Sequence, residues 1–532
     1  MSSAAAENTR EQSAFAPFTH KAFAVIWIAT VLSNIGTWMH DVGAGWLMTN
    51  LNPSPMMVAL VQTATTLPVF LFALPAGALA DLMDRRRLLL AAQTILAALA
   101  VCLGFMVYAG QISPVLLLLF TFLMGTFSAF STPAWQAITP SLVPRNVLNS
   151  AVSLNSVGIN ISRAIGPALA GVILVQVGLA APFMVNALSF LVVIAALWWW
   201  TPPKKAERTL PAEDILGAMW TGVRYARNSR PFKNTVLRAV GFFLFASAYW
   251  ALLPLVTKKN LGGGSELYGI LLGSVGAGAV LGALMLPKVR TRLKADHVVL
   301  LGTVGTAISL GLFAVTAQSF VAVAASIIAG ASWIGVLTTL NVSAQTSLPD
   351  WVRARGLSLF VMAFFGSQTL GSLLWGQLAS RTTISIALLV AAAGLLLAVP
   401  LFWGFKLHQE KTADLTPSAH WPEPVLAHKV ELDRGPVMIT VEYIIDVKKK
   451  TEFVAVMDSL SSERRRDGAY SWGIFEDTEK PGRFLEYFLV ASWLEHLRQH
   501  ERVTKSAHDV QMEARRFHVL LEEPVVSHFV SP

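Results

Sequence analysis

Long apolar runs, broken only by short charged clusters, fill the first 407 residues and constrain the fold more than any other feature. A helix needs about 20 apolar residues to cross the hydrocarbon of a bilayer. Only 14% of the residues are charged, against about 25% in an average soluble protein. The sequence therefore predicts an all-α polytopic membrane protein with twelve spans in two groups of six. Their expected bounds are 22–50, 57–81, 87–110, 112–139, 147–177, 180–200, 234–257, 267–287, 297–316, 319–347, 355–380 and 383–406.

The same runs divide the chain into domains. A polar N-terminal tail (1–21) precedes one six-helix bundle (22–200). A polar linker (201–233), with room for one amphipathic helix, leads to a second bundle (234–407). A second linker (408–430) leads to a soluble segment of ordinary composition (431–532).

Basic residues fall mostly in alternate loops and predict the orientation, because Lys and Arg mark cytoplasmic loops. Arg85, Arg145, Lys204 and Arg290 lie in one set of loops, whereas the other set offers chiefly Lys258, Lys259 and Arg381. We expect a multi-pass protein of the inner membrane with both termini in the cytoplasm. The N-terminus has no apolar core or cleavage site of a signal peptide. The net charge of +9 therefore reflects topology and not nucleic-acid binding.

The two groups of spans repeat each other at an offset of 205 residues. Gly77 corresponds to Gly282, and Arg85 corresponds to Arg290, within one register that three separate regions share. Parallel repeats of six helices place a substrate site between two similar bundles.

The loop between the second and third spans reads Gly77-Ala-Leu-Ala-Asp81-Leu-Met-Asp84-Arg85-Arg86-Arg87. It resembles the cytoplasmic loop signature of the major facilitator superfamily, with Asp84 in place of the family's usual glycine. The resemblance implies a gating motif in which Gly77 permits tight helix contact and Asp81 locks the bundles together in one state. An alternative is that the arginines act only as topological anchors.

Further motifs resemble the enterobactin-exporter-like branch of that superfamily, often described as transmembrane secretion effectors. They are Gly36-Thr-Trp-Met39 with Asp41, Ser131-Thr-Pro-Ala-Trp135, Leu142-Val-Pro-Arg145, Arg163-Ala-Ile-Gly-Pro167 and, near the C-terminus, Ser492-Trp-Leu-Glu-His-Leu-Arg-Gln-His500. The resemblance covers nearly the whole chain. It implies efflux of a siderophore, a drug or a metabolite, coupled to protons, without naming the substrate.

Polar side chains recur at helical spacing in the fifth span and predict a stripe that faces protein or water. Shorter stripes occur in the fourth and tenth spans. The candidates for lining a cavity are Asn34, Thr132, Gln136, Asn149, Ser153, Ser156, Asn160, Thr338, Asn341 and Gln345. The alternative is that the small polar residues only join helices by hydrogen bonds.

Asp41 and Arg163 are charges inside spans, and such charges need partners. At about 1.5 Å per residue they lie at similar depths, roughly 30 Å and 24 Å along their helices. The first and fifth spans are neighbours in the fold that the sequence resembles. We therefore predict an Asp41–Arg163 pair that couples proton uptake to transport. The alternative is a static pair that only holds the bundle together.

Glycines in the fifth and eighth spans predict close helix approach. Gly166 and Gly171 lie in the fifth span, and Gly273 and Gly276 lie in the eighth. Close approach of this kind is typical of bundles that rock against each other, although glycine is common in membrane helices generally.

The C-terminal segment predicts a strand (437–446), a helix (449–465), a hairpin (469–476 and 484–491), a second helix (492–502) and a last strand (524–530). This order is typical of a ferredoxin-like domain, and its outline resembles small dimeric monooxygenases. We expect dimerisation through the sheet. We expect no cofactor, no metal site and no catalytic residue, because neither a cofactor signature nor a metal-ligand pattern occurs.

Two functions compete at this stage. The first is a transporter that moves a small-molecule substrate through the lipid bilayer by alternating access. The second is a membrane-anchored enzyme or sensor that acts through the C-terminal domain. A primary pump is disfavoured because no GxxxxGK[ST] phosphate loop occurs.

Overall fold

A computed structural model describes residues 15–202, 215–407, 414–416, 418, 421 and 430–531. The chain forms two compact units. The first unit consists of Met1–Pro211, Leu237–Asn341 and Phe360–Phe405. The second consists of Ala212–Val236, Val342–Leu359 and Lys406–Pro532.

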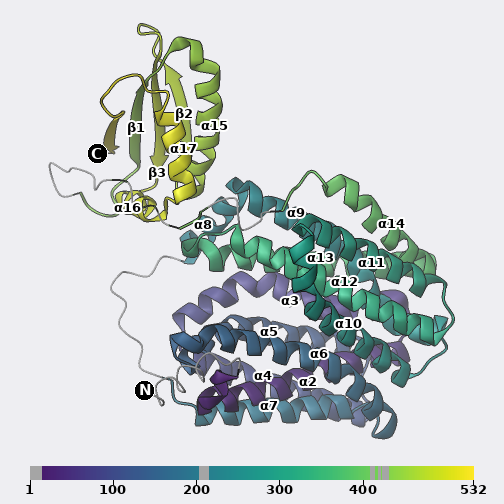
Figure 1. Ribbon diagram of the computed structural model, residues 1–532. Coiled ribbons are helices and arrows are strands. Elements are labelled where there is room, and N and C mark those ends of the chain that lie inside the picture. The colour runs from purple at the N-terminus through teal and green to yellow at the C-terminus, as the bar shows by residue number, and fades with distance from the viewer. Residues whose placement is uncertain are drawn as a thin grey trace, which may run out of the picture. The chain divides into compact units, whose positions relative to one another are not determined.

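Twelve helices in the described part of the chain are long and apolar enough to cross a membrane, which confirms the predicted number of spans. The first six are α2 (Lys21–Leu51), α3 (Pro55–Leu82), α4 (Arg85–Tyr108), α5 (Pro114–Leu142), α6 (Leu148–Gln176) and α7 (Ala181–Trp199). The second six are α9 (Arg230–Leu255), continued by a π-helical turn Val256–Asn260, α10 (Ser265–Arg292), α11 (Ala295–Val315), α12 (Ser319–Thr346), α13 (Asp350–Arg381) and α14 (Ile384–Phe402). A shorter helix, α8 (Ile215–Asn228), lies between the two groups in the sequence. In Figure 1 the first group runs from purple to blue and the second from teal to green.

The observed bounds of most spans differ from the predicted ones by a few residues, and the third span shows why. Its helix α4 begins at Arg85, before the predicted start at residue 87, because Asp84 caps it. The carboxylate of Asp84 accepts a hydrogen bond of 2.9 Å from the backbone N–H of Arg87. An aspartate at this position satisfies a backbone N–H of the first turn, which has no partner within the helix.

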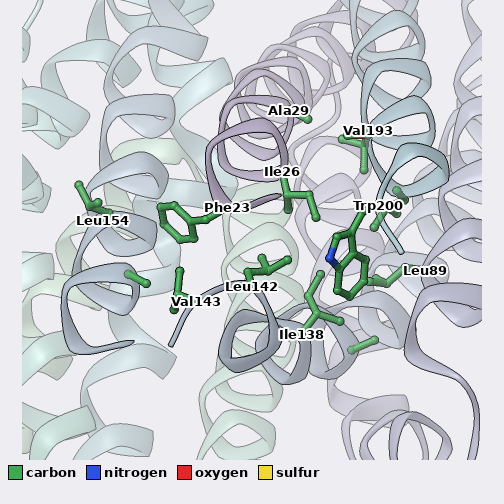
Figure 2. Close-up of a cluster of buried hydrophobic side chains, with 14 of the residues drawn as sticks. Phe23, Ile26, Ala29, Leu89, Ile138, Leu142, Val143, Leu154, Val193 and Trp200 are labelled. Carbon is green, nitrogen blue, oxygen red and sulfur yellow. The ribbon is translucent and has the colours of Figure 1, made fainter. Parts of the chain in front are cut away.

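The first bundle has its own apolar core. Figure 2 shows Phe23 and Ile26 of α2, Ile138 and Leu142 of α5, and Trp200 after α7 turned toward one another. Trp200, which directly follows the C-terminal end of α7, is only 5% exposed. The end of the predicted sixth span is therefore packed against the other helices of the first bundle. Burial of this kind contributes about 25 cal/mol per Å² of apolar surface in soluble surroundings.

The two bundles contact each other closely along part of their length. We call the end with the connections 83–84 and 293–294 the basic end, and the end with the connections 52–54 and 261–264 the far end. Toward the far end, α6 of the first bundle packs on α10 of the second. A Cβ added at Gly269 of α10 would lie 2.7 Å from the Cα of Gly171 of α6, so a side chain has no room there.

The C-terminal part of the second unit is a four-stranded antiparallel sheet of order β2-β3-β1-β4. Its elements are β1 (Val437–Ile444), α15 (Lys450–Asp467), β2 (Ser471–Glu476), β3 (Arg483–Val490), α16 (Trp493–Arg502), α17 (Lys505–Arg515) and β4 (Val525–Val530). Two apolar clusters fill the inner face of the sheet. One joins the strands to α15 and α17, and the other joins them to Trp493 of α16. Figure 1 shows α15 and α17 against the sheet.

The predicted strands and the first two helices of this segment are present within a few residues of their expected bounds. The helix α17 was not predicted, because its stretch follows α16 after only two residues, Val503 and Thr504. Thr504 begins the new helix by accepting a hydrogen bond of 3.2 Å from the backbone N–H of Ala507. Ala514 of α17 is fully buried in the domain core.

Candidate functional site

An aromatic cluster spans the boundary between the bundles. Trp38 of α2 contacts Trp250 of α9 with ring centroids 6.3 Å apart. Trp250 lies edge-on to Trp333 of α12 at 5.6 Å, and Tyr249 packs against both rings at 4.8 Å and 5.9 Å. Phe364 of α13 extends the cluster to a fourth helix at 6.1 Å from Trp333. Rings from both bundles thus meet at one place within the membrane-spanning helices.

Arg163 of α6 brings a positive charge to this aromatic cluster. Its guanidinium lies over the ring of Trp38 at 5.4 Å from the centroid, and the hydroxyl of Tyr249 is its electrostatic neighbour. Gly166 makes the approach possible, because a Cβ there would lie 2.6 Å from the Cβ of Trp38. A guanidinium stacks well on aromatic rings and donates paired hydrogen bonds to carboxylates.

Three donors in this place have no hydrogen-bond partner among the residues that the structure describes. They are the Nε of Arg163, the hydroxyl of Tyr249 and the Nε1 of Trp250, all buried. An unsatisfied buried donor is costly, and such groups need an explanation when they occur together. Donors beside flat aromatic rings are suited to a planar, anionic ligand.

The far end of the bundle interface is closed beyond this site by contacts that we call the seam. The hydroxyls of Thr66 of α3 and Thr369 of α13 are hydrogen-bonded at 2.8 Å and buried. The ammonium of Lys258 donates to the backbone O of Thr49 at 3.0 Å. Trp46 stacks on Tyr268 at 5.9 Å nearby. The seam also includes the Gly171–Gly269 contact of α6 and α10.

Many of the predicted cavity-lining residues are exposed on helix faces, toward the basic end of the bundles. Thr132, Gln136, Ser153, Ser156 and Gln345 are exposed. The half-buried candidates are Asn34, Asn160, Thr338 and Asn341. The side chain of Asn149 is outside the described residues. Exposed polar side chains within lipid-spanning helices have to contact water or protein, so these faces stay candidates for a water-filled route.

The structure does not bring Asp41 and Arg163 together. Among the described residues no ion pair joins them, and Arg163 instead lies over Trp38. Asp41 has the phenol of Tyr268, on α10, as its electrostatic neighbour. The predicted pair failed because similar depth along two helices does not specify which way each side chain turns around its own helix.

The loop motif is well defined at its basic residues. Arg85 donates from Nη1 to the backbone O of Ala137 at 2.9 Å. Arg86 donates to the backbone O atoms of Leu197 at 2.8 Å and Trp198 at 2.7 Å. These bonds tie α4 to α5 and to the C-terminal end of α7, so the two arginines do more than set topology.

The remaining motif residues give less evidence for a gate. Among the described residues, no atom lies within 4 Å of a Cβ added at Gly77, so tight helix contact at this position stays a prediction. Asp84 caps α4 within its own bundle. The side chain of Asp81 is outside the described residues, and its gating role stays a prediction.

Sequence reasoning missed the aromatic part of the site, because Trp and Tyr in an apolar span are easily read as packing residues. A signal was available. Trp and Tyr concentrate at membrane interfaces, whereas Trp38, Tyr249, Trp250 and Trp333 are well inside their helices.

Two helical bundles enclose a buried site whose polar groups have no hydrogen-bond partner among the described residues, and the bundles are in contact beyond one end of that site. This arrangement is typical of a membrane transporter. The model of the family described as "Transmembrane secretion effector" matches residues 12–532, and the chain belongs to this family. It is thus a transporter and not an enzyme.

The chain is also similar to curated relatives and, in fold, to solved structures. The chain is 28% identical to the staphyloferrin A transporter of Staphylococcus aureus over 64% of its own length and 85% of that protein. It is 24% identical to the enterobactin exporter EntS of Shigella boydii over 71% and 90%, respectively. A POT family transporter in complex with a thioalcohol-conjugated peptide superposes with a TM-score of 0.59 at 11% identity, over 72% of this chain and 96% of that one. A bacterial homologue of the human lysosomal transporter Spinster, in an inward-facing conformation, gives 0.56 at 16% identity, over 74% and 99%. At such identities the two structures show a common fold.

Proposed function

We propose that this protein is a secondary active transporter that exports a small anionic molecule across the inner membrane by alternating access, with protons as the coupling ion. The observation that carries the proposal is the guanidinium of Arg163, buried against Trp38 with an unpartnered Nε at the bundle boundary. The names of the relatives, an enterobactin exporter and a staphyloferrin A transporter, support a siderophore as the first substrate to try. A drug or another metabolite with a carboxylate or a catechol suits the same chemistry.

The proposed orientation places the basic end and both termini in the cytoplasm. The closed seam at the far end then corresponds to an inward-facing state, in which substrate reaches Arg163 from the cytoplasm along the exposed faces of α5 and α6. Opening the seam and closing the basic end would release the substrate outside.

We propose Asp41 as the proton carrier, acting without Arg163 as its partner. Its neighbour Tyr268 belongs to the other bundle, so opening the seam would replace the phenol with water around the carboxyl group. A carboxyl group whose surroundings alternate in this way can bind and release one proton per cycle.

For the C-terminal segment we propose a ferredoxin-like domain from residue 431 to 532, beyond the 408–430 linker. The strand order β2-β3-β1-β4 and the helices after β1 and β3 support this assignment. The outer sheet face supports dimerisation, because Phe475, Leu485 and Phe529 are 61%, 41% and 52% exposed on it.

The test uses everted membrane vesicles, in which export appears as uptake. Enterobactin and staphyloferrin A serve as probes, with and without an imposed proton gradient. We expect gradient-driven uptake of at least one probe by the wild-type chain. Arg163→Gln should abolish it, and Arg163→Lys should keep part of it, because the charge remains but the planar stack on Trp38 is lost. Unchanged uptake in a well-expressed Arg163→Gln protein contradicts the proposed site.

A chain that ends at Leu407 separates the transporter from the competing reading, a membrane-anchored enzyme or sensor that acts through the monooxygenase-like C-terminal domain. Transport by this shortened chain supports the proposal. Full abundance of the shortened chain without any transport would favour a function located in the C-terminal domain.

A further inference from the structure

The C-terminal domain contacts α8 through a buried ion pair. The Nη2 of Arg224, on α8, lies 2.9 Å from the Oε1 of Glu495, on α16, and the two side chains are only 15% and 13% exposed. Glu495 also accepts hydrogen bonds from Arg502 at 2.7 Å and 3.3 Å. Burial by itself raises the pKa of Glu495, but Arg502 and Arg224 outweigh it and hold that pKa below its usual value. The carboxylate is therefore charged at neutral pH, between two guanidinium groups.

Two arginines of the C-terminal domain, Arg502 and Arg466, lie on aromatic rings outside it. The guanidinium of Arg502 lies over Trp351, in the first turn of α13, at 4.7 Å from the ring centroid. The guanidinium of Arg466 lies over Tyr225 of α8 at 5.6 Å. Both arginine side chains are less than one-tenth exposed. Stacked and buried arginines make a specific contact, unlike the loose ion pairs of a protein surface.

Tyr225 links α8 to the connection between α12 and α13. Its hydroxyl donates to the backbone O of Ser347 at 3.1 Å, and its ring is edge-on to Trp351 at 5.8 Å. Gly222, one turn earlier on α8, leaves room for Arg355, because a Cβ there would lie 3.0 Å from the Cβ of that arginine. Three parts of the second unit therefore meet in one cluster: α8, the α12–α13 connection and the C-terminal domain.

This cluster involves α8 and the first turn of α13. The helix α8 belongs to the linker between the bundles, and α13 runs without a break from Asp350 to Arg381. The same helix carries Thr369, whose hydroxyl closes the seam with Thr66. Because a helix transmits displacement along its axis, restraint of its first turn restrains its seam-forming part as well.

We propose that the C-terminal domain is an intramolecular clasp that fixes α8 to the α12–α13 connection and thereby slows the opening of the seam. A tethered domain binds its own chain at high effective concentration, so the clasp is closed at rest. Release of the domain then raises the rate at which the bundles exchange between conformations. The C-terminal domain is in this view a regulator of transport and needs no catalytic activity.

The experiment breaks the clasp from the α8 side, so that the domain itself is unchanged. Arg224→Glu places a second carboxylate against Glu495. Arg227→Glu, on an exposed position of the same helix, makes the same charge change and is the matched control. Both are made in the full chain with Cys102→Ser, which removes the only cysteine, and with Thr369→Cys as a reporter of seam opening.

Two measurements follow in the purified protein: hydrogen exchange of the backbone of residues 215–228, and the rate of maleimide labelling at position 369. We expect Arg224→Glu to raise both, the labelling rate by about fivefold, and Arg227→Glu to raise neither. Trp351→Leu, which removes the ring under Arg502, should act like Arg224→Glu. Unchanged exchange in Arg224→Glu overturns the clasp, and raised exchange with unchanged labelling overturns its effect on the seam. Neither readout needs a substrate, so a wrong assignment of substrate or coupling ion cannot produce these outcomes.

Discussion

Replacing Gly269 by alanine should open the seam without touching the proposed substrate site. The added Cβ would lie 2.7 Å from the Cα of Gly171 and 2.8 Å from the backbone O of Pro167. Both are backbone atoms, so no flexible side chain can move aside. Overpacking of this kind costs about 1–3 kcal/mol, and that cost applies only while the seam is closed. At about 1.4 kcal/mol per tenfold change, the open state should gain about 5- to 150-fold in relative population.

Gly273→Ala is the matched control, one turn further along the same helix. Its Cβ would lie 3.4 Å from the Cβ of Ala168, which is an ordinary contact. The assay is maleimide labelling of Thr369→Cys in the Cys102→Ser chain, with an impermeant reagent applied from each side of the membrane. Equal labelling in the Gly269 and Gly273 variants would refute the argument that this seam is the moving contact. Equal losses of thermal stability in both would point to a general packing defect instead.

Three further predictions concern single side chains. Arg163→Gln should weaken the apparent affinity for the transported anion by about 10- to 150-fold, because a hydrogen bond to a charged group contributes about 1.5–3 kcal/mol; an affinity unchanged in binding titrations would contradict this. Arg86→Ala should lower the melting temperature in detergent, because it removes two bonds to the C-terminal end of α7, whereas Arg87→Ala, at an exposed position, should not. Burial, with His500 and His528 nearby, lowers the pKa of His496 to about 3, while the unfolded chain binds its proton near pH 6.5. The contribution of His496 to the stability of the C-terminal domain is therefore fully present above about pH 7. The free energy of unfolding should fall by about 1.4 kcal/mol per pH unit on acidification below about pH 6. The urea midpoint of a 430–532 fragment, followed against pH, measures this fall, and the midpoint of His496→Leu should depend on pH much less.

The spans could be predicted from the sequence because the bilayer imposes one length and one polarity on every crossing helix. The same simple rule does not apply to the soluble segment. There α17 follows α16 after only two residues, and its apolar pattern is too short to distinguish a helix from a loop. Its start depends on one cap at Thr504 and its position on the burial of Ala514. Such local contacts carry little signal in a single sequence.

The candidate site was only half predictable for a related reason. The charge of Arg163 within an apolar span predicts a contact with another polar or aromatic group, and the structure shows the ring of Trp38 in that place while Nε stays without a hydrogen-bond partner among the described residues. Which partner it finds depends on how α6 is rotated and how closely it approaches α2. Gly166 permits that approach and brings Trp38 beneath the guanidinium, whereas the electrostatic neighbour of Asp41 is Tyr268 of α10.

The composition of the seam has a consequence for how water enters the protein. Besides the Trp46–Tyr268 stack and Lys258, the seam consists of glycine backbone on α6 and α10 and threonine hydroxyls on α3 and α13. Wetting an apolar surface costs roughly 25 cal/mol per Å², but peptide groups and hydroxyls are readily hydrated. The core in Figure 2 is the reverse case, because its leucine, isoleucine and aromatic side chains would all have to be hydrated at once. We therefore expect water to enter along the border between the two bundles and not through the core of either bundle.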